Sequence, residues 1–257
     1  MAAILVMEIR FLVEPALLAD GTLVVADLHL GIEAELAKSG VNIPSQMPSV
    51  QKRIENLIGS TKAKHLVILG DVKHNVPGFS WNERKELPGF LAALASKARL
   101  SIVKGNHDGG IEALAPEGVK VYGPGGFRLG DIGFVHGHAW PSPRLLSCRT
   151  LVIAHSHPSV EFFSSGARVT EHVWLRCPVD SKVMEGHYGR PCGIEEAIIM
   201  PAFNPLSGGS AFNSEGFRPI GPLLANSAVA WRESKVYLLD GTYLGALEKL
   251  KSREGKD

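Results

Sequence analysis

The chain has 257 residues, 45% of them hydrophobic and 21% charged, so it is long enough to bury a full core without a partner. Its formal net charge of +1 excludes binding to nucleic acid or membranes through a strong overall field, although a local patch would suffice. Three cysteines, far apart and without C-x-x-C spacing, argue against a disulfide framework and favour a reducing cytoplasm.

The first half of the chain alternates strand and helix patterns. Its first apolar segment, 3–13, predicts a strand, and Glu8 and Arg10 interrupt it before it reaches the length of a signal peptide or membrane span, so no membrane partner is expected. Further short β-branched runs predict strands at 23–26, 65–69 and 100–103. Helical spacing separates these runs at 32–38, about 45–58 and about 84–98. This alternation favours a largely parallel sheet with helices outside it.

Beyond about residue 119, short strands linked by Gly and Pro turns replace the helical periodicity. The strands predicted there are 119–121, 126–129, 133–135, 151–154, 160–163 and 169–175. They indicate a second sheet stacked on the first. We therefore expect an α/β fold, a four-layer α-β-β-α sandwich of two stacked mixed sheets with helices on both outer faces.

The remaining segments complete this picture. Residues 123–128, rich in Gly, predict a hairpin turn, and 177–222, rich in Gly and Pro, predict a long ordered loop system. Apolar stretches that return the chain to the core lie at 229–231, 236–239 and 243–250. We expect residues 1–250 to form a single domain and the charged tail, 251–257, to fray.

The positions of the histidines carry most of the chemical information. Ligand sites in α/β sheets gather at the carboxyl edge, because loops from several rigid strands converge there. Seven of the ten histidines lie at or just after the end of a predicted strand: His29, His74, His107, His136, His138, His155 and His157.

Two strand ends in the first half also present carboxylates. In an extended backbone, residues i and i+2 point to the same face, so Asp27 and His29 can hold one metal ion together. The next strand ends in Gly70-Asp71, and a carboxylate with two oxygens can bridge two cations.

Three more strand ends are equally rich in ligand atoms. Gly105-Asn106-His107-Asp108 presents an amide oxygen, an imidazole and a carboxylate in succession, and His136-Gly-His138 and His155-Ser-His157 each follow an apolar strand. One such motif alone is weak evidence for a metal site. Five such motifs in succession are difficult to explain as unrelated polar residues, because each buried polar group would need its own hydrogen-bond or charge partner.

The series Asp27-x-His29, Gly70-Asp71, Gly105-Asn106-His107-Asp108, His136-Gly and His155-x-His157 resembles the calcineurin-like metallophosphoesterase superfamily, over roughly residues 20–160. Within it, Asp27-Leu-His-Leu-Gly and Gly70-Asp-Val-Lys-His74 look like the small prokaryotic phosphoesterases related to the SbcD nuclease subunit. Pro201-Ala-Phe-Asn and Asp240-Gly-Thr-Tyr-Leu-Gly resemble the same subgroup less specifically.

This resemblance implies two divalent metal ions and their ligands. One ion would take Asp27, His29 and His157, the other would take Asn106, His136 and His155, and Asp71 would bridge them. Nitrogen and oxygen donors without thiolate suit Mn²⁺, Fe²⁺ or Zn²⁺ and argue against Ca²⁺. Manganese is the first choice by resemblance alone.

The implied reaction is in-line attack on phosphorus by a metal-bridging hydroxide. His107 lies outside the ligand set and is the catalytic candidate, which would protonate the leaving oxygen or stabilise charge on the phosphoryl group. A seventh ligand or a purely structural histidine is the alternative.

Three further residues are candidates for contact with substrate or for support of a ligand. The SbcD-like motif suggests such a role for His74, and His138 stands close to a ligand, but either could be a bystander. Asp108 either orients His107 or caps the following turn, and the sequence does not choose between these readings.

The leading interpretation is a phosphodiesterase or nuclease whose partner is a phosphodiester, either nucleic acid or a nucleotide. Lys73, Arg84, Lys85 and Lys104 lie near the predicted metal edge and could meet phosphates, although scattered lysines usually form a solvated surface. A phosphatase or pyrophosphatase for a small nucleotide or lipid-linked substrate is the enzymatic alternative, since one metal centre serves all of these. A non-catalytic scaffold of the same fold should have lost ligands that are complete here. The sequence leaves any protein partner, including a partner ATPase, undetermined.

Overall fold

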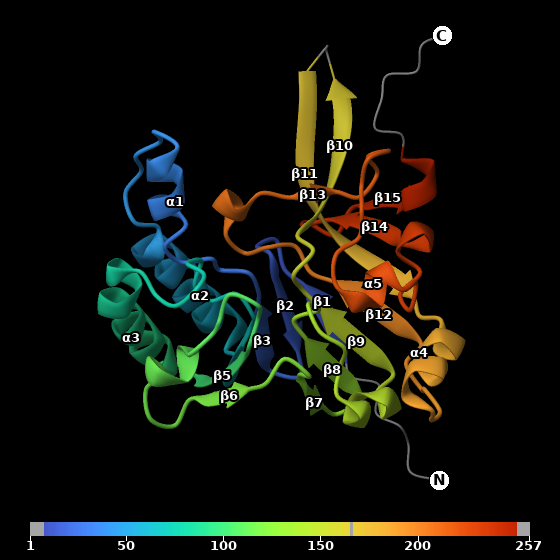
Figure 1. The fold of residues 1–257 in the computed structure, drawn as a ribbon, viewed down its shortest axis with the longest axis horizontal. Helices are drawn as coiled ribbons and strands as arrows, with labels where there is room; N and C mark the ends of the chain where they lie inside the picture. The colour runs from blue at the N-terminus through green and yellow to red at the C-terminus, as the bar shows by residue number, and fades with distance from the viewer. Residues whose placement is uncertain (1–7, 165–166, 251–257) are drawn as a thin grey trace.

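Two β-sheets lie face to face in the middle of the molecule, with helices on either side (Figure 1). The computed structural model describes residues 8–164 and 167–250, so the start of the first predicted strand and the charged tail fall outside the described residues. In the first sheet, β1 to β3 are antiparallel and β3 to β6 are parallel. Its described strands, in spatial order, are β1 (Ile9–Phe11), β2 (Ala16–Ala19), β3 (Thr22–Val25), β4 (His65–Leu69), β5 (Arg99–Val103) and β6 (Lys120–Tyr122).

The second sheet is also mixed. Its order is β13-β10-β11-β12-β9-β8-β7, with β14 paired to β11 and to β15, and β8, β9 and β12 are parallel. The long strand β11 pairs with β10 near its start and with β12 and β14 further along. The described strands are β7 (Phe127–Leu129), β8 (Ile132–Val135), β9 (Thr150–Ile153), β10 (Pro158–Ser164), β11 (Ala167–Pro178), β12 (Glu196–Ile199), β13 (Ser210–Ala211), β14 (Lys235–Leu238) and β15 (Tyr243–Ala246).

Helices cover the outer faces of both sheets. The first sheet is flanked by α2 (Met47–Thr61) and α3 (Trp81–Ala95), and the second by α4 (Ser181–Tyr188) and α5 (Pro222–Ala225). Helix α1 (Glu33–Lys38), which has no buried residue, projects beyond the edge of the first sheet (Figure 1). The described residues also form short 3₁₀ helices, which are η1 (Ile111–Ala113), η2 (Pro143–Ser147), η3 (Pro205–Ser207), η4 (Trp231–Glu233) and η5 (Leu247–Lys249). This arrangement confirms the predicted four-layer sandwich. None of the described helices combines the length and the apolar character that crossing a bilayer requires.

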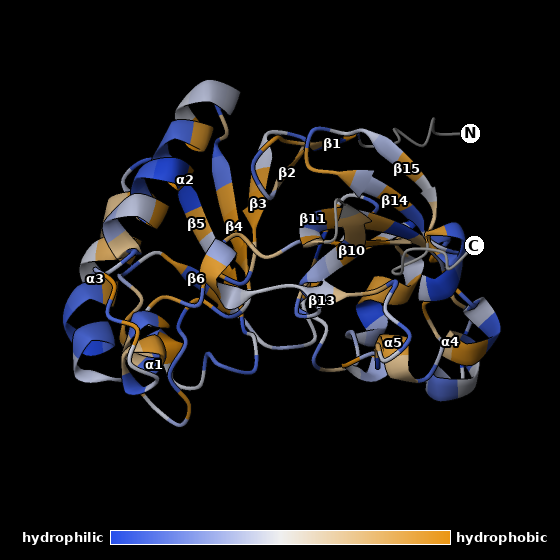
Figure 2. Cartoon of the chain, turned by 90° about the horizontal axis from the view of Figure 1, so that it is seen from above, coloured by the Kyte–Doolittle hydropathy of each residue, from blue (hydrophilic) through white to orange (hydrophobic). Residues whose placement is uncertain are grey.

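Apolar cores separate the layers, and β4 shows how one strand serves two of them. Leu66 and Ile68 pack towards α2 and α3, whereas Val67 and Leu69 pack against the second sheet. Because successive side chains point to opposite faces, a strand buried on both sides must be apolar throughout. In Figure 2, β3 and β4 are accordingly largely orange, while α2 and α3 show blue as well as orange. A further core lies outside the second sheet and includes Met184 of α4.

The start of α3 follows from a capping box. The Ser80 hydroxyl accepts a hydrogen bond from the Glu83 N–H (3.2 Å), and the Glu83 carboxylate accepts one from the Ser80 N–H (2.6 Å). Two otherwise unpaired backbone donors are thereby satisfied, and the helix begins at Trp81, earlier than its hydrophobic spacing predicts.

The structure corrects three details of the predicted organisation. Strand β2 was not expected, and the segment 177–222 is not only a loop system, since it contains α4, β12 and β13. Strand β12 lies between β9 and β11, but Gly and Pro on both sides hide its short apolar run. The Gly-rich segment 123–128 is not a hairpin turn, because β6 belongs to the first sheet and β7 to the second, so the chain crosses between sheets there. The hairpin is formed by β7 and β8.

Candidate metal centre

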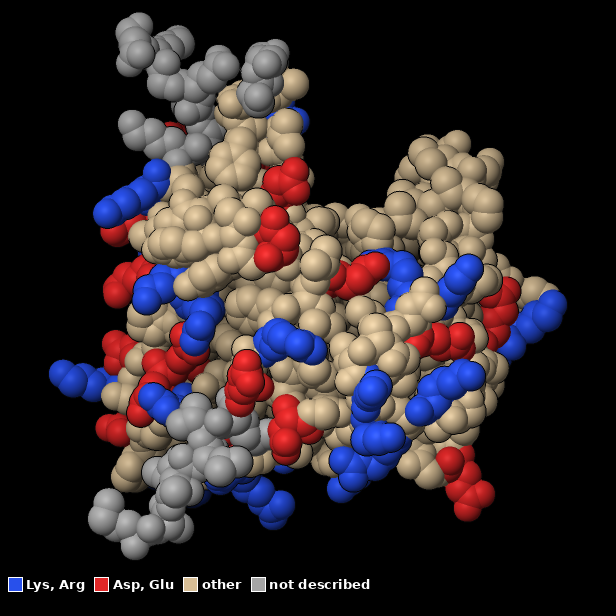
Figure 3. Space-filling model, turned by 180° about the vertical axis from the view of Figure 1, so that it is seen from behind, with Lys and Arg blue, Asp and Glu red and all other residues tan. Residues whose placement is uncertain are grey.

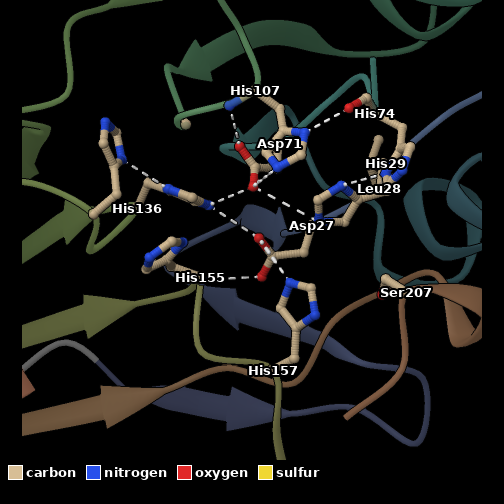
Figure 4. A network of polar contacts seen from close by, with 12 residues as sticks. Asp27, Leu28, His29, Asp71, His74, His107, His136, His155, His157 and Ser207 are labelled. Atoms are coloured by element: carbon tan, nitrogen blue, oxygen red, sulfur yellow. Dashed lines mark hydrogen bonds and ion pairs between the residues drawn. The ribbon is translucent and has the colours of Figure 1, made fainter. Parts of the chain in front are cut away.

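The polar residues predicted at the strand ends meet in one cluster between the two sheets (Figure 4). The first sheet contributes the loops after β3, β4 and β5, and the second contributes the loops after β8 and β9. These strands all end at the same edge, where loops of an α/β fold converge. The members of the cluster are Asp27, His29, Asp71, His107, His136, His155 and His157.

The backbone at this edge is unusual. Strand β3 ends at Val25, and Asp27 and His29 have left-handed backbones, with φ of +54° and +40°, so the expected extended Asp-x-His arrangement is wrong. Their N–H groups instead donate to Gly70 O (3.1 Å) and Asp71 O (2.8 Å). Left-handed φ is costly for residues other than glycine and persists only when surrounding contacts impose it, a pattern typical of functional sites. The other cluster members with positive φ are Asp71 (+47°), His155 (+71°) and His157 (+41°).

Asp27 is fully buried and surrounded by histidines. Its Oδ1 lies 3.0 Å from His136 Nε2 and 3.5 Å from His157 Nε2, and its Oδ2 accepts a hydrogen bond from the His155 N–H (3.1 Å). Burial alone would raise the pKa of Asp27, but the charge of His157 and hydrogen bonds from His136 and His157 lower it below its usual range. This carboxylate is therefore ionised.

Asp71 lies at the centre of the cluster. Its Oδ2 is 3.5 Å from His136 Nε2, 3.7 Å from His29 Nε2 and 4.0 Å from His107 Nε2. Its Oδ1 accepts a hydrogen bond from the His107 N–H (2.9 Å). One oxygen is thus fixed by the backbone while the other faces imidazoles from both sheets, which is the placement that a bridging carboxylate requires.

Among the described residues, three sets of candidate ligand atoms each have their atoms within 4.8 Å of one another, and two of these sets contain a carboxylate, the third being His29, His74 and His107. We call the two sets with a carboxylate the first subsite (Asp27, His29 and His157) and the second subsite (Asp71, His136 and His155). Both sets combine imidazole nitrogen with carboxylate oxygen, and Asp71 lies between them. Such donors fit Mn²⁺, Fe²⁺ or Zn²⁺, so the residues present suit divalent metal ions.

Asn106 differs from the other predicted ligands. Its side chain is exposed, and within residues 8–164 and 167–250 no described contact joins its amide to the cluster. It follows Gly105, whose added Cβ would lie 2.1 Å from Asp71 Oδ1. The backbone before Asn106 therefore passes directly beside the central carboxylate, and the assignment of Asn106 as a ligand stays a prediction.

Comparison with known proteins agrees with this geometry. The sequence model of the family described as calcineurin-like phosphoesterase matches residues 22–220. The chain belongs to this family. It is therefore a metal-dependent phosphoester hydrolase of the calcineurin-like phosphoesterase family.

One solved structure shows the same fold as this phosphoesterase. The crystal structure of Pseudomonas putida nuclease MPE aligns over 91% of this chain and 98% of that chain, with a TM-score of 0.57 and 16% sequence identity. The E. coli phosphoesterase YfcE aligns over 88% of this chain and 98% of its own, with a TM-score of 0.39 and 18% identity. No curated protein matches the sequence.

Four histidines predicted as ligands in the phosphoesterase divide into two electrostatic classes. Burial lowers the pKa of His29 and of His155 to about 3, so both imidazoles are neutral, the form that binds metal. Burial also acts to lower the pKa of His136 and His157, but Asp27 outweighs it and raises both above their ordinary value. Without metal, these two imidazolium groups compensate the buried carboxylates.

We expect metal binding to release protons. His136 and His157 must lose their protons to become ligands, so the apparent affinity for Mn²⁺ should rise with pH as the two imidazoles, whose pKa values lie above the ordinary value, deprotonate, and fall as both residues become protonated. Calorimetric titrations in buffers with different ionisation enthalpies measure the number of protons released. Equal enthalpies in all buffers would contradict this expectation.

His107 stands beside the central carboxylate with a defined proton arrangement. Its Nδ1 lies 2.5 Å from the carbonyl oxygen of His74, so Nδ1–H donates this hydrogen bond. Its Nε2 then faces Asp71 Oδ2, and its side chain is 24% exposed. The ring is therefore oriented with Nε2 towards the cluster, and the doubly protonated form of the ring has a proton there to give to a bound group.

His74 and His138 each contact a cluster histidine. His136 Nδ1 and His138 Nδ1 are 2.9 Å apart, and His29 Nδ1 and His74 Nδ1 are 3.3 Å apart. A donated Nδ1–H leaves Nε2 of His136 and of His29 directed at the carboxylates, as a ligand needs. His74 Nε2 in turn forms a hydrogen bond with Glu35 Oε2 (2.6 Å). Glu35 belongs to α1, and no sequence motif identified it.

Asp108 holds two of the site loops together. Its Oδ1 accepts hydrogen bonds from the N–H groups of Val72 (2.9 Å) and Lys73 (3.4 Å), and its Oδ2 accepts one from Gly105 (2.9 Å). Burial raises the pKa of Asp108 to about 6. Its oxygens bind the backbone of the loops after β4 and β5 and make no described contact with the His107 ring.

Two of the expected phosphate-binding lysines are engaged elsewhere. Lys73 is only 1% exposed, and its Nζ donates to Asn75 O (2.5 Å), so it is neither a solvated surface lysine nor free to meet a phosphate. Lys104 is paired with Glu112 (2.7 Å).

Gly70 is required by the site for two reasons. Its φ is +84°, and an added Cβ would lie 2.1 Å from Cδ2 of the buried His136 ring. We therefore expect Gly70→Ala to displace His136 and to weaken metal binding about tenfold or more, by analogy with lost ligand support. Titration with Mn²⁺ tests this, with Gly59→Ala on α2 as the control, because an added Cβ there meets nothing within 4 Å. Unchanged affinity would contradict the packing argument.

Proposed function

We propose that this phosphoesterase is a two-metal phosphodiesterase that cleaves nucleic acid or a nucleotide-derived diester. The observation that carries the proposal is the hollow between α1 and the β10–β11 hairpin, two projections that begin close to residues of the metal centre (Figure 1 and Figure 3). A groove accepts a chain that continues beyond the scissile phosphate, whereas an enclosed pocket would fit a small monoester.

Two projections rise from the loops of the metal centre. Helix α1 begins at Glu33, shortly after His29, and the β10–β11 hairpin begins at Pro158, directly after His157. Figure 1 shows both on the same edge of the molecule, and in Figure 3, viewed from behind, that edge is hollowed between them. The ligands His29 and His157 thus lie at the base of opposite walls.

The hairpin wall carries groups suited to nucleotide bases. Phe163 is 36% exposed, and the Arg168 guanidinium lies 5.7 Å from the centre of its ring. Aromatic and guanidinium planes stack on bases of any sequence. On the face shown in Figure 3, basic and acidic side chains are interspersed, so stacking and metal contacts support the proposal more than a broad basic surface does.

Phe163→Ser should discriminate polymer from small substrate. Base stacking is worth about 1–3 kcal/mol, so we expect KM for single-stranded DNA to rise about fivefold or more, with little change for a bis-aryl phosphate. Tyr243→Ser, which removes an exposed aromatic ring from β15, is the matched control. Equal KM values for DNA in wild type and Phe163→Ser would show that Phe163 on the hairpin does not bind the substrate.

The residues of the cluster have distinct roles in this proposal. One ion would be held by the first subsite and the other by His136, His155 and Asn106, and Asp71 would be shared by both. Bound divalent cations supply Lewis acidity and lower the pKa of the attacking water. His107, held through Nδ1 by the His74 carbonyl, donates its Nε2 proton to the leaving oxygen.

We propose manganese as the resident metal and a reducing cytoplasm as the compartment. The donor set accepts Mn²⁺, Fe²⁺ and Zn²⁺, and resemblance of the motifs favours the first. Cys148 and Cys177 are free and buried, which suits a compartment that keeps thiols reduced.

A substrate panel tests the proposal. Purified protein with Mn²⁺ is incubated with a bis-aryl phosphate, a mono-aryl phosphate, single-stranded DNA and a nucleoside diphosphate, and product formation is measured with and without EDTA. We expect metal-dependent turnover of the diester and the DNA. Turnover of the monoester alone would show that the protein is a phosphatase, and turnover of the diphosphate alone would show that it is a pyrophosphatase. Either result would contradict the proposed diesterase activity.

A further inference from the structure

The C-terminal segment that follows β12 lies against the loop of the first subsite. The Phe203 N–H donates to Ala26 O (2.9 Å), and Asn204 Nδ2 donates to Leu28 O (2.8 Å). Leu28 is the residue between the ligands Asp27 and His29. An amide 176 residues away in sequence therefore binds the backbone between two ligands, and at 1% exposure it cannot exchange this contact for water.

Asn204 also shapes the turn that reaches the third ligand of this subsite. Its Oδ1 accepts a hydrogen bond from the Leu206 N–H (3.0 Å), and its backbone oxygen accepts one from the Ser207 hydroxyl (2.6 Å). The Ser207 backbone in turn accepts a hydrogen bond from His157. Figure 4 shows Ser207 near His157 and Leu28 near His29.

A residue of α2 holds the segment around Phe203 in place. The Arg53 guanidinium donates to Phe203 O (3.2 Å) and lies 4.2 Å from the centre of the Phe203 ring. Asn204 is thus anchored on one side before it contacts the metal loops on the other.

We infer that Asn204 is a positioning residue of the first subsite, which sets the geometry of Asp27, His29 and His157 together. The inference rests on the proposed two-metal site. Asp27 and His29 keep left-handed backbones that need support from outside their own loop, and the Asn204 amide supplies it at the residue between them. Its donor and acceptor are both used, so neither a carboxylate nor a hydroxyl replaces it.

The substitution Asn204→Asp tests the hydrogen bond that the Asn204 amide donates to Leu28 O. The variant keeps an acceptor for Leu206 but places a carboxylate oxygen against Leu28 O. We expect Mn²⁺ titration by calorimetry to show one site weakened about 10- to 100-fold, the usual cost of a lost ligand support, and the other site unchanged. Asn213→Asp is the matched control, because Asn213 pairs with the backbone of Glu161 (2.8 and 2.9 Å) in the same part of the chain.

A second variant and a second measurement separate positioning from folding. Ser207→Ala removes only the hydroxyl contact to Asn204 O and should weaken the same site by a few-fold in a folded protein, as for loss of a single hydrogen bond. Thermal unfolding in EDTA reports stability without metal, and saturating Mn²⁺ should return kcat of Asn204→Asp towards wild type.

Two outcomes would overturn the inference: Asn204→Asp with both Mn²⁺ affinities equal to those of wild type, or both sites weakened equally in Asn204→Asp and Asn213→Asp. A protein that binds two Mn²⁺ ions but hydrolyses no phosphate ester refutes the proposed function instead. The titration uses no substrate, so it tests Asn204 in either case.

Discussion

Asp71→Asn is expected to lower kcat/KM for a bis-aryl phosphate by about 10³-fold or more and to reduce the number of Mn²⁺ ions bound. Asp71 Oδ2 faces His29 and His136, which come from different sheets, so this one carboxylate oxygen is shared by both subsites. Metal assistance is worth several kcal/mol, and about 1.4 kcal/mol corresponds to tenfold in rate. The amide keeps an oxygen for the His107 N–H, so the local backbone should be retained.

Steady-state kinetics and metal analysis of the same preparations check this result. The control is Asp240→Asn, which changes a carboxylate that accepts only a hydrogen bond from Thr242 in an exposed turn. If Asp71→Asn keeps both full metal content and wild-type turnover, the two-metal account is wrong.

His107→Asn is expected to lower kcat by about 10²- to 10⁴-fold, the range of general acid catalysis, while metal affinity stays unchanged. The Asn amide can still donate to His74 O in place of Nδ1–H, but it has no group at the position of Nε2. The loss should be largest for DNA, whose leaving alkoxide needs a proton, and smallest for a nitrophenyl ester, whose leaving group is already a weak base.

Comparison of the two substrates therefore identifies the role of His107. His187→Asn serves as the control, because His187 lies on α4 and stacks on Trp140 away from the cluster. An equal loss for both substrates, together with weaker Mn²⁺ binding, would make His107 a ligand instead of an acid.

The sequence predicted the part of the site that local patterns encode. Apolar β-branched runs that end in Gly or a ligand residue specify buried parallel strands, and the carboxyl ends of such strands must share an edge. The central position of Asp71, and the gathering of His29, His136 and His157 around it and Asp27, follow from this rule.

Long-range contacts were beyond these patterns. The hydrogen bonds of Glu35 to His74 and of Asn204 to Leu28 join residues far apart in the chain, and neither residue type is distinctive by itself. Strand β12 escaped because its four residues lie among glycines and prolines, although β9 and β11 complete its pairing on both sides. The left-handed backbone at Asp27 likewise depends on the neighbouring loop at Gly70.

Because both sheets contribute residues to the cluster, bound metal ions should stabilise the packing of one sheet against the other. Asp27, His29 and Asp71 belong to one layer, and His136, His155 and His157 belong to the other, so each ion would crosslink the layers. A ligand that binds only the assembled state stabilises it in proportion to the logarithm of its concentration over Kd. Removal of the metal ions by a chelator should therefore loosen the interface between the sheets, where Val67 and Phe134 pack. Faster hydrogen exchange of the backbone amides in this interface would show the loosening without an activity assay.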